Sequence, residues 1–211
     1  MIGIIDYGMG NLSSVQKSVE RQNAECRLIT KPEEVLASDK LILPGVGAFE
    51  NAITFLRRSN LVEAMLEKIK SGTPFLGICL GMQMLFERSF ENGEFEGLGL
   101  LKGEVVRFDF TKEQIAMAGE KLSIPHIGWN QITVEQPDHP FWKGIIPGTF
   151  FYFVHSYHLV SEAKADIASR TFYGYEFCSA ITRENIVATQ FHPEKSQGAG
   201  LKLLENFIHR M

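Results

Sequence analysis

Roughly the first eighty residues alternate short apolar runs with stretches of helical periodicity, and this alternation restricts the folds open to the chain. The apolar runs, each bounded by turn residues, predict strands that are buried on both faces. They are Ile2 to Ile5, Arg27 to Ile29, Lys40 to Leu43 and Phe75 to Cys79. Between them apolar residues recur every three or four positions, as on one face of a helix. We therefore expect an α/β sheet with helices on both faces.

From about residue 103 to residue 191 the pattern changes to one strand after another. The predicted strands are Glu104 to Phe108, Gln131 to Val134, Phe150 to Leu159, Ile167 to Thr171, Phe177 to Ile181 and Ile186 to Gln190. A helix returns at the end, where Leu201, Leu204 and Phe207 share one face. The chain shows no internal repeat or Pro/Ser-rich linker. We expect one domain over residues 1–211, with a β-rich C-terminal half.

The charge and the apolar content of the chain limit the kinds of partner that we expect. Lys and Arg total 21 and Asp and Glu total 25, so the net charge is −4. This charge is too small to predict binding to nucleic acid or to an anionic membrane. No apolar run approaches the roughly 18 residues of a bilayer span. The N-terminus lacks the basic and apolar regions of a signal peptide, so we expect a cytoplasmic protein.

The segment from Thr73 to Phe86 reads as a strand, a sharp turn and a helix, with Cys79 at the turn. Gly77 and Gly81 stand two residues to either side, where side chains would obstruct a tight bend, as in a nucleophile elbow. A helix that starts at the next residue favours the thiolate form of the cysteine. The alternative is that Cys79 is a small buried apolar residue. Cys26 and Cys178 lack such a turn, and we expect them to be buried apolar residues.

A nucleophilic thiolate needs a proton shuttle, and His192 directly follows a predicted strand. In an extended segment, residues two apart project to the same side, so Glu194 can reach one nitrogen of the His192 ring. The sequence thus predicts a triad of Cys79, His192 and Glu194, in which the carboxylate orients the imidazole. Alone, this His-Pro-Glu segment is equally consistent with a surface turn that carries an ion pair.

A glycine-rich turn, Leu43 to Gly47, follows another predicted strand. In open α/β sheets ligands bind beyond the carboxyl ends of the strands, so this turn can lie beside the elbow. Its backbone N–H groups, together with that of Leu80, would form an oxyanion hole. The alternative is an ordinary strand-to-helix turn.

No metal, nucleotide or redox cofactor is expected. His155 and His158 fall three apart on one predicted strand and would therefore face opposite ways. The three cysteines have no C-x-x-C spacing, and their odd number argues against a disulfide framework. Gly97, Gly99 and Gly103 lack the spacing of a dinucleotide-binding turn.

Two of these segments resemble the signatures of the class I (triad) glutamine amidotransferases: Gly77 to Gln83 and Phe191 to Glu194. Over nearly the whole chain the sequence is similar to one branch of that family, the glutaminase subunits of imidazole glycerol phosphate synthase. The motifs of this resemblance are Ile5 to Leu12, Leu43 to Gly47, Pro125 to Asn130, Tyr152 to Tyr157 and His192 to Ser196.

The resemblance implies a flavodoxin-like amidotransferase fold in which Cys79 attacks the side-chain amide of glutamine. It implies that Gly45, Gln83, Ser156 and Tyr157 bind glutamine and that Val46, Gly47 and Leu80 complete the oxyanion hole. Trp129, Asn130 and Lys195 would contact the partner, a (β/α)₈ barrel cyclase, in a heterodimer. The cyclase would use the released ammonia in histidine biosynthesis to make imidazole glycerol phosphate and an aminoimidazole carboxamide ribonucleotide.

Two alternatives stay open at this point. A paralogous glutaminase would supply ammonia to another synthase, such as one for modified surface sugars. A stand-alone cysteine hydrolase or a non-catalytic binding module would not depend on a partner. The sequence departs from the family pattern in segment 111–123, which is somewhat long, and at Ile127, where methionine is common.

Overall fold

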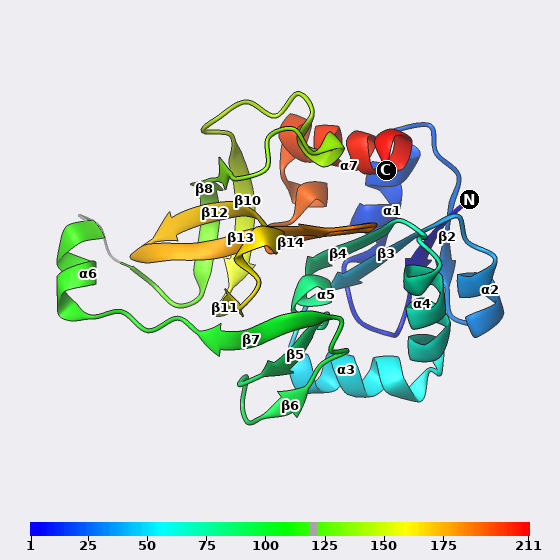
Figure 1. Ribbon diagram of the computed structural model, residues 1–211, viewed down its shortest axis with the longest axis horizontal. Helices are drawn as coiled ribbons and strands as arrows, with labels where there is room; N and C mark the ends of the chain where they lie inside the picture. The colour runs from blue at the N-terminus through cyan, green and yellow to red at the C-terminus, as the bar shows by residue number, and fades with distance from the viewer. Residues whose placement is uncertain (119–121) are drawn as a thin grey trace.

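The computed structural model describes residues 1–118 and 122–211. Parallel strands form one half of its main sheet (Figure 1), in the order β2-β1-β3-β4-β14. They are β1 (Ile2–Ile5), β2 (Cys26–Ile29), β3 (Lys40–Gly45), β4 (Phe75–Cys79) and β14 (Ile186–Thr189). This is the strand order of flavodoxin-like sheets. The predicted α/β class is confirmed.

The other half of the sheet continues from β14 through mostly antiparallel strands in the order β13-β11-β7-β5-β6. Their bounds are Tyr175–Arg183, Tyr157–Ser161, Leu101–Arg107, Phe86–Ser89 and Phe95–Glu96. Strand β12 (Ile167–Tyr173) pairs with β13 and with β9 (Thr133–Val134). A separate two-stranded sheet joins β8 (His126–Gln131) to β10 (Phe150–His155). The expected β-rich C-terminal half is thus present.

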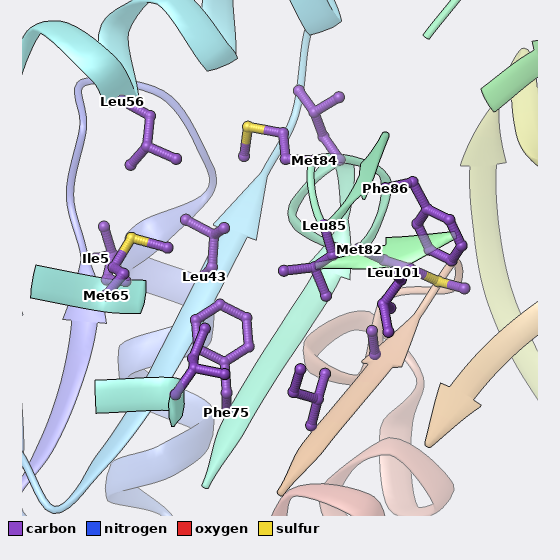
Figure 2. Close-up of a cluster of buried hydrophobic side chains, with 14 of the residues drawn as sticks. Ile5, Leu43, Leu56, Met65, Phe75, Met82, Met84, Leu85, Phe86 and Leu101 are labelled. Carbon is purple, nitrogen blue, oxygen red and sulfur yellow. The ribbon is translucent and has the colours of Figure 1, made fainter. Parts of the chain in front are cut away.

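Helices cover both faces of the parallel half. Helices α1 (Leu12–Glu20) and α7 (Gln197–Arg210) pack on one face, and α3 (Phe49–Arg58) and α4 (Leu61–Lys70) pack on the other. Figure 2 shows the second layer, in which Leu43 and Phe75 from the strands meet Leu56 and Met65 from the helices. Successive side chains on each buried strand point to opposite faces, so one sheet supports two apolar layers.

Short helices complete the described chain. They are α2 (Pro32–Leu36), α5 (Leu80–Gln83), α6 (Lys112–Ala118) and the 3₁₀ turns η1 (Pro140–Trp142), η2 (Lys164–Asp166) and η3 (Pro193–Lys195). Helix α6 lies in segment 111–123 and projects from the far end of the molecule, at the left of Figure 1. Within residues 1–118 and 122–211, no helix has the length and apolar character needed to cross a bilayer.

The prediction of one strand over Phe150 to Leu159 was wrong. The structure has two strands there, with Ser156 between them. Strand β10 pairs with β8 in the small sheet, whereas β11 pairs with β7 and β13 in the main sheet. The apolar residues continue through the bend because both strands face buried layers, so hydrophobicity alone did not reveal the break. Helix α6 was also missed.

Candidate active site

Four loops meet at the carboxyl ends of adjacent parallel strands. The loops after β1, β3 and β14 carry Asn11, Val46 with Gly47, and His192, and Cys79 is the last residue of β4, at the turn into α5. A cavity of about 380 Å³ opens at this edge. It is lined by Asn11, Val46, Gly47, Cys79, Leu80, Gln83, Glu91, Val154, His155, Ser156, Tyr157 and Lys195. This is the position at which open α/β sheets bind ligands.

Cys79 ends β4 in a conformation that few residues other than glycine adopt, with φ 53° and ψ −108°. Helix α5 begins at the next residue, as predicted, but it makes a single turn. A Cβ atom on Gly81 would overlap the carbonyl oxygen of Leu43, and one on Gly77 would lie 3.0 Å from the Gly81 carbonyl oxygen. Both glycines are therefore needed for the helix to pack directly on the sheet. The predicted elbow is confirmed.

His192 and Glu194 form a buried pair, in which Nδ1 of the imidazole lies 2.7 Å from Oε1 of the carboxylate. The predicted contact is present, but the segment is not extended: Pro193 begins η3, and this turn folds Glu194 back onto the ring. Proline favours such a turn because its φ is fixed near the helical value. The other ring nitrogen, Nε2, is buried and has no hydrogen-bond partner among the described residues.

Charge on the neighbouring groups decides the protonation of His192. Burial alone lowers the pKa of an imidazole, but the negative charge of the Cys79 thiolate and the bond to Glu194 raise the pKa of His192 to about 10. The ring is therefore an imidazolium at neutral pH. Burial raises the pKa of Cys178 to about 12, so that thiol stays neutral. The three cysteines are free, and Cys79 alone of them lines the cavity.

Two glutamine side chains lie next to the nucleophile. Gln83, on α5, donates to the carbonyl of Tyr157 at 3.1 Å and to Oε1 of Gln190 at 3.0 Å. Gln190 in turn donates from Nε2 to Cys79 Sγ at 3.6 Å. Gln83 was predicted as a site residue, but Gln190 was not. Its position two residues before His192 could have suggested it, because alternate residues of an extended segment share one side.

The residues predicted for the oxyanion hole all line the cavity: Val46, Gly47 and Leu80. Gly47 adopts a φ of +98°, which is strained for any residue with a side chain. Gly45 lies deeper, paired with Cys79 across β3 and β4, and a Cβ atom there would lie 2.8 Å from that of Leu80. Its contacts are with the elbow, and it is absent from the cavity lining.

The remaining predicted residues divide between the cavity and a second hollow. Ser156 and Tyr157 line the cavity, as does Lys195, whose Nζ lies 5.8 Å from the centre of the Tyr152 ring. Trp129 of β8 makes an edge contact with the same ring at 6.2 Å. Trp129 and Asn130 border a second hollow, of about 580 Å³, on the outer side of β8. Of the three predicted partner contacts, Lys195 thus lines the cavity, whereas Trp129 and Asn130 border the second hollow.

The cavity also holds residues that the sequence analysis did not select, including Glu91, Asn11 and His155. Glu91 accepts a bond from the backbone N–H of Phe49 at 2.7 Å, and burial raises its pKa. His155 and His158 lie on different strands, so the argument that they face apart on one strand was wrong. Among the described residues, no three His, Cys, Asp or Glu side chains could hold a metal ion.

Comparison with known proteins agrees with this geometry. The family model described as "Glutamine amidotransferase class-I" matches residues 3–211. The chain is 49% identical over 207 residues to "Imidazole glycerol phosphate synthase subunit HisH" of Syntrophotalea carbinolica, covering 98% of each chain. It is also 49% identical to the HisH subunit of Sulfurimonas denitrificans, covering 98% of this chain and 97% of that protein.

Solved structures with low sequence identity share the fold. One described as "Crystal structure of glutamine amidotransferase" superposes with a TM-score of 0.72 at 18% identity, covering 98% of each chain. A fold shared at this identity does not establish an activity. The assignment of this chain to a family rests instead on the family model and on the relatives at 49% identity. The chain belongs to the class I glutamine amidotransferases and, within them, to the HisH subunits of imidazole glycerol phosphate synthase.

Proposed function

We propose that the chain, acting as one amidotransferase domain, hydrolyses glutamine to glutamate and ammonia through a thioester on Cys79. One observation carries the proposal: Cys79 stands on a strained turn at the cavity wall, next to the buried pair of His192 and Glu194. A nucleophile, a base and a group that orients the base are the parts that such catalysis needs. The HisH relatives support glutamine as the substrate.

In the first half of the reaction the Cys79 thiolate attacks the amide carbon of glutamine. The negative charge moves to the carbonyl oxygen, where the N–H of Leu80 and the turn at Val46 and Gly47 would stabilise it. The His192 imidazolium then donates its Nε2 proton to the nitrogen as the C–N bond breaks. Ammonia leaves, and a thioester to Cys79 remains.

In the second half, neutral His192 removes a proton from water, and the resulting hydroxide attacks the thioester carbon. This attack forms a tetrahedral intermediate. Its collapse breaks the C–S bond, which releases glutamate and restores the thiolate and the imidazolium. Glu194 keeps Nδ1 of the ring occupied, so Nε2 is the nitrogen that exchanges protons in both halves.

Charges at the cavity wall suit a zwitterionic amino acid. The carboxylate of Glu91 can pair with the α-ammonium group of glutamine, and polar groups of Gln83, Ser156 and Tyr157 can bind the rest. A volume of about 380 Å³ falls in the lower part of the range for small-molecule sites. These features support the substrate-binding residues that the family resemblance implies.

We infer that the ammonia goes to the cyclase subunit, a (β/α)₈ barrel, for synthesis of imidazole glycerol phosphate in the histidine pathway. The docking face would include Trp129 and Asn130, with Lys195 at the cavity opening. Exposed apolar side chains around Trp129 support this face: Ile127, Phe150 and Phe172. The proposal keeps the cytoplasmic location expected from the sequence.

Replacement of the nucleophile tests the chemistry. We expect Cys79→Ala to abolish glutamate formation from glutamine, because no other cysteine lines the cavity, while the folded content and binding to the cyclase stay unchanged. Cys26→Ala, which removes a thiol outside the cavity, is the matched control and should keep full activity. Glutamate release by Cys79→Ala at the normal rate would show that the triad is wrongly assigned.

A further inference from the structure

The direction of the Gln190 amide is fixed by its neighbour. Gln83 donates to Oε1 of Gln190, so the amide oxygen must face Gln83 and the NH₂ group must face Cys79. Gln190 is fully buried, and Gln83 is nearly so. If the amide turned over, its oxygen would meet the thiolate and two NH₂ groups would face each other. The observed orientation is therefore the only one in which all three groups have compatible partners.

The Tyr157 carbonyl can only accept, so it orients the Gln83 amide, and the same carbonyl is held by a series of hydrogen bonds that reaches Asn130 on β8. The Tyr157 carbonyl accepts from Gln83 and also, at 2.8 Å, from Nδ1 of His155. Nε2 of His155 must then be an acceptor, and it lies 3.1 Å from Nδ1 of His126. Nε2 of His126 accepts, at 3.3 Å, from the side-chain amide of Asn130.

Both histidines are buried and neutral, so each donates from one ring nitrogen and accepts at the other. The hydrogen bonds therefore all run in one direction, from Asn130 to the Tyr157 carbonyl. Burial lowers the pKa of His126 to about 4 and that of His155 well below its ordinary value. A neutral imidazole has one donor and one acceptor, so fixing one bond fixes the next. Asn130 cannot turn over either, because its oxygen accepts from the N–H of Gln131 at 2.8 Å and its NH₂ group donates to the Phe172 carbonyl at 2.9 Å.

We propose that Gln190 is a further catalytic residue, which donates a hydrogen bond to the Cys79 sulfur, and that Asn130, His126 and His155 are positioning residues that hold this donor in place through Gln83. The inference deepens the proposed function and rests on it, since it assumes that Cys79 is the nucleophile. A donor to the sulfur stabilises the thiolate relative to the thiol. Asn130 connects this effect to the hollow beside β8.

The pH dependence of alkylation tests the first part. In the full chain, the rate of Cys79 modification by iodoacetamide is followed from pH 5 to pH 9, with the modified peptide identified by mass spectrometry. Gln190→Met keeps the length of the side chain and removes the donor. We expect the midpoint of the profile to move up by about one pH unit, since a hydrogen bond to a charged group biases an equilibrium roughly ten-fold. The titratable neighbours His192 and Tyr7 are left in place.

The positioning residues are tested with ring-for-ring variants. His126→Phe and His155→Phe keep an aromatic ring and break the chain, so each should move the midpoint in the same direction by a smaller amount. The double variant should move it no further than the larger single one, because the two residues act in series. His158→Phe is the matched control: His158 is buried against Phe108 like His155, but it bonds to Leu159 and Tyr175, outside the chain.

Two results would overturn the proposal: an unchanged profile in Gln190→Met, or equal shifts in His126→Phe and the His158→Phe control. Thermal unfolding of each variant accompanies the profiles. If His155→Phe fails to fold, His126→Phe and Asn130→Ala supply the same test from the far end of the chain. Alkylation does not require glutamine turnover. A protein that shows the expected profiles but releases no glutamate would therefore contradict the proposed function and the catalytic role of Gln190, while the hydrogen bond to the sulfur and its positioning residues would stand.

Discussion

His192 is the residue whose charge state controls both halves of the proposed reaction. It must be protonated when ammonia leaves and neutral when water is activated. The thiolate of Cys79 and the carboxylate of Glu194 favour the protonated form in the resting site, and formation of the thioester removes one of these two charges. The reaction itself therefore lowers the affinity of the ring for its proton at the step where a base is needed.

The residue-scale prediction concerns Glu194→Gln. Loss of the carboxylate leaves His192 with a lower pKa than the wild-type value of about 10, so the imidazolium is lost at a lower pH. We expect glutaminase activity to fall by roughly 10²-fold or more. The alkaline limb of the rate profile should also move to lower pH, as measured by glutamate release from pH 6 to pH 10.

Glu194→Gln should also change how the free energy of unfolding depends on pH. The pKa of His192 is higher in the folded state than in the unfolded state. Its contribution to stability is therefore fully present below pH 6.5, the ordinary pKa, and disappears as the pH rises through about 10. Urea unfolding should therefore show the largest difference between wild type and Glu194→Gln below pH 6.5. A difference that grows with rising pH would contradict the assigned charge states.

At the scale of elements, the turn between β4 and α5 brings α5 very close to the backbone of β3. This approach is possible only because residue 81 has no side chain. A Cβ atom on Gly81 would overlap the Leu43 carbonyl. We expect Gly81→Ala to destabilise the fold by about 1–3 kcal/mol and to reduce the rate, because it displaces the neighbouring Leu80, whose N–H is proposed to stabilise the oxyanion. Urea denaturation and glutamate release measure the two effects.

Gly198→Ala is the control for this prediction. Gly198 lies in α7 with no atom within 4 Å of a Cβ at that position. Alanine there should leave activity unchanged and stabilise the protein by up to about 1 kcal/mol. Equal stability losses in the two variants would mean that the close approach at Gly81 does not matter.

The sequence predicted the elements that carry local signals. The parallel strands, the turn at Cys79 and the pair of His192 and Glu194 each follow from residues close together in sequence: apolar runs, glycine spacing and a His-x-Glu segment. Gln190 and the histidine chain were missed because their partners are distant in sequence, as with Gln190 and Cys79. The break at Ser156 was missed because it separates two equally apolar strands that pair in different sheets.

At the scale of the whole molecule, the small β8–β10 sheet brings an exposed apolar face close to the active-site cavity. Tyr152 contacts both Trp129 on that face and Lys195 at the cavity wall. A partner that docks on β8 would contact the strand paired with β10, and Val154 and His155 of β10 line the cavity. This arrangement predicts that docking and glutamine hydrolysis affect each other.

Trp129→Ala tests the docking face. A half-exposed aromatic residue at the centre of an interface contributes about 2 kcal/mol or more, so we expect affinity for the cyclase to fall roughly 30-fold by calorimetry. Phe55→Ala is the control, because Phe55 is similarly exposed on α3, which lies well apart from β8 in Figure 1. If both variants bound equally well, the docking face would lie elsewhere.

The neighbouring strands β4 and β14, which end next to the thiol and the imidazole, are separated by more than half of the polypeptide. During synthesis on the ribosome, a nascent chain that ends before β14 has the cysteine without its base. Unfinished chains would thus not hydrolyse glutamine in the cell, and ammonia release would begin only after β14 has been translated.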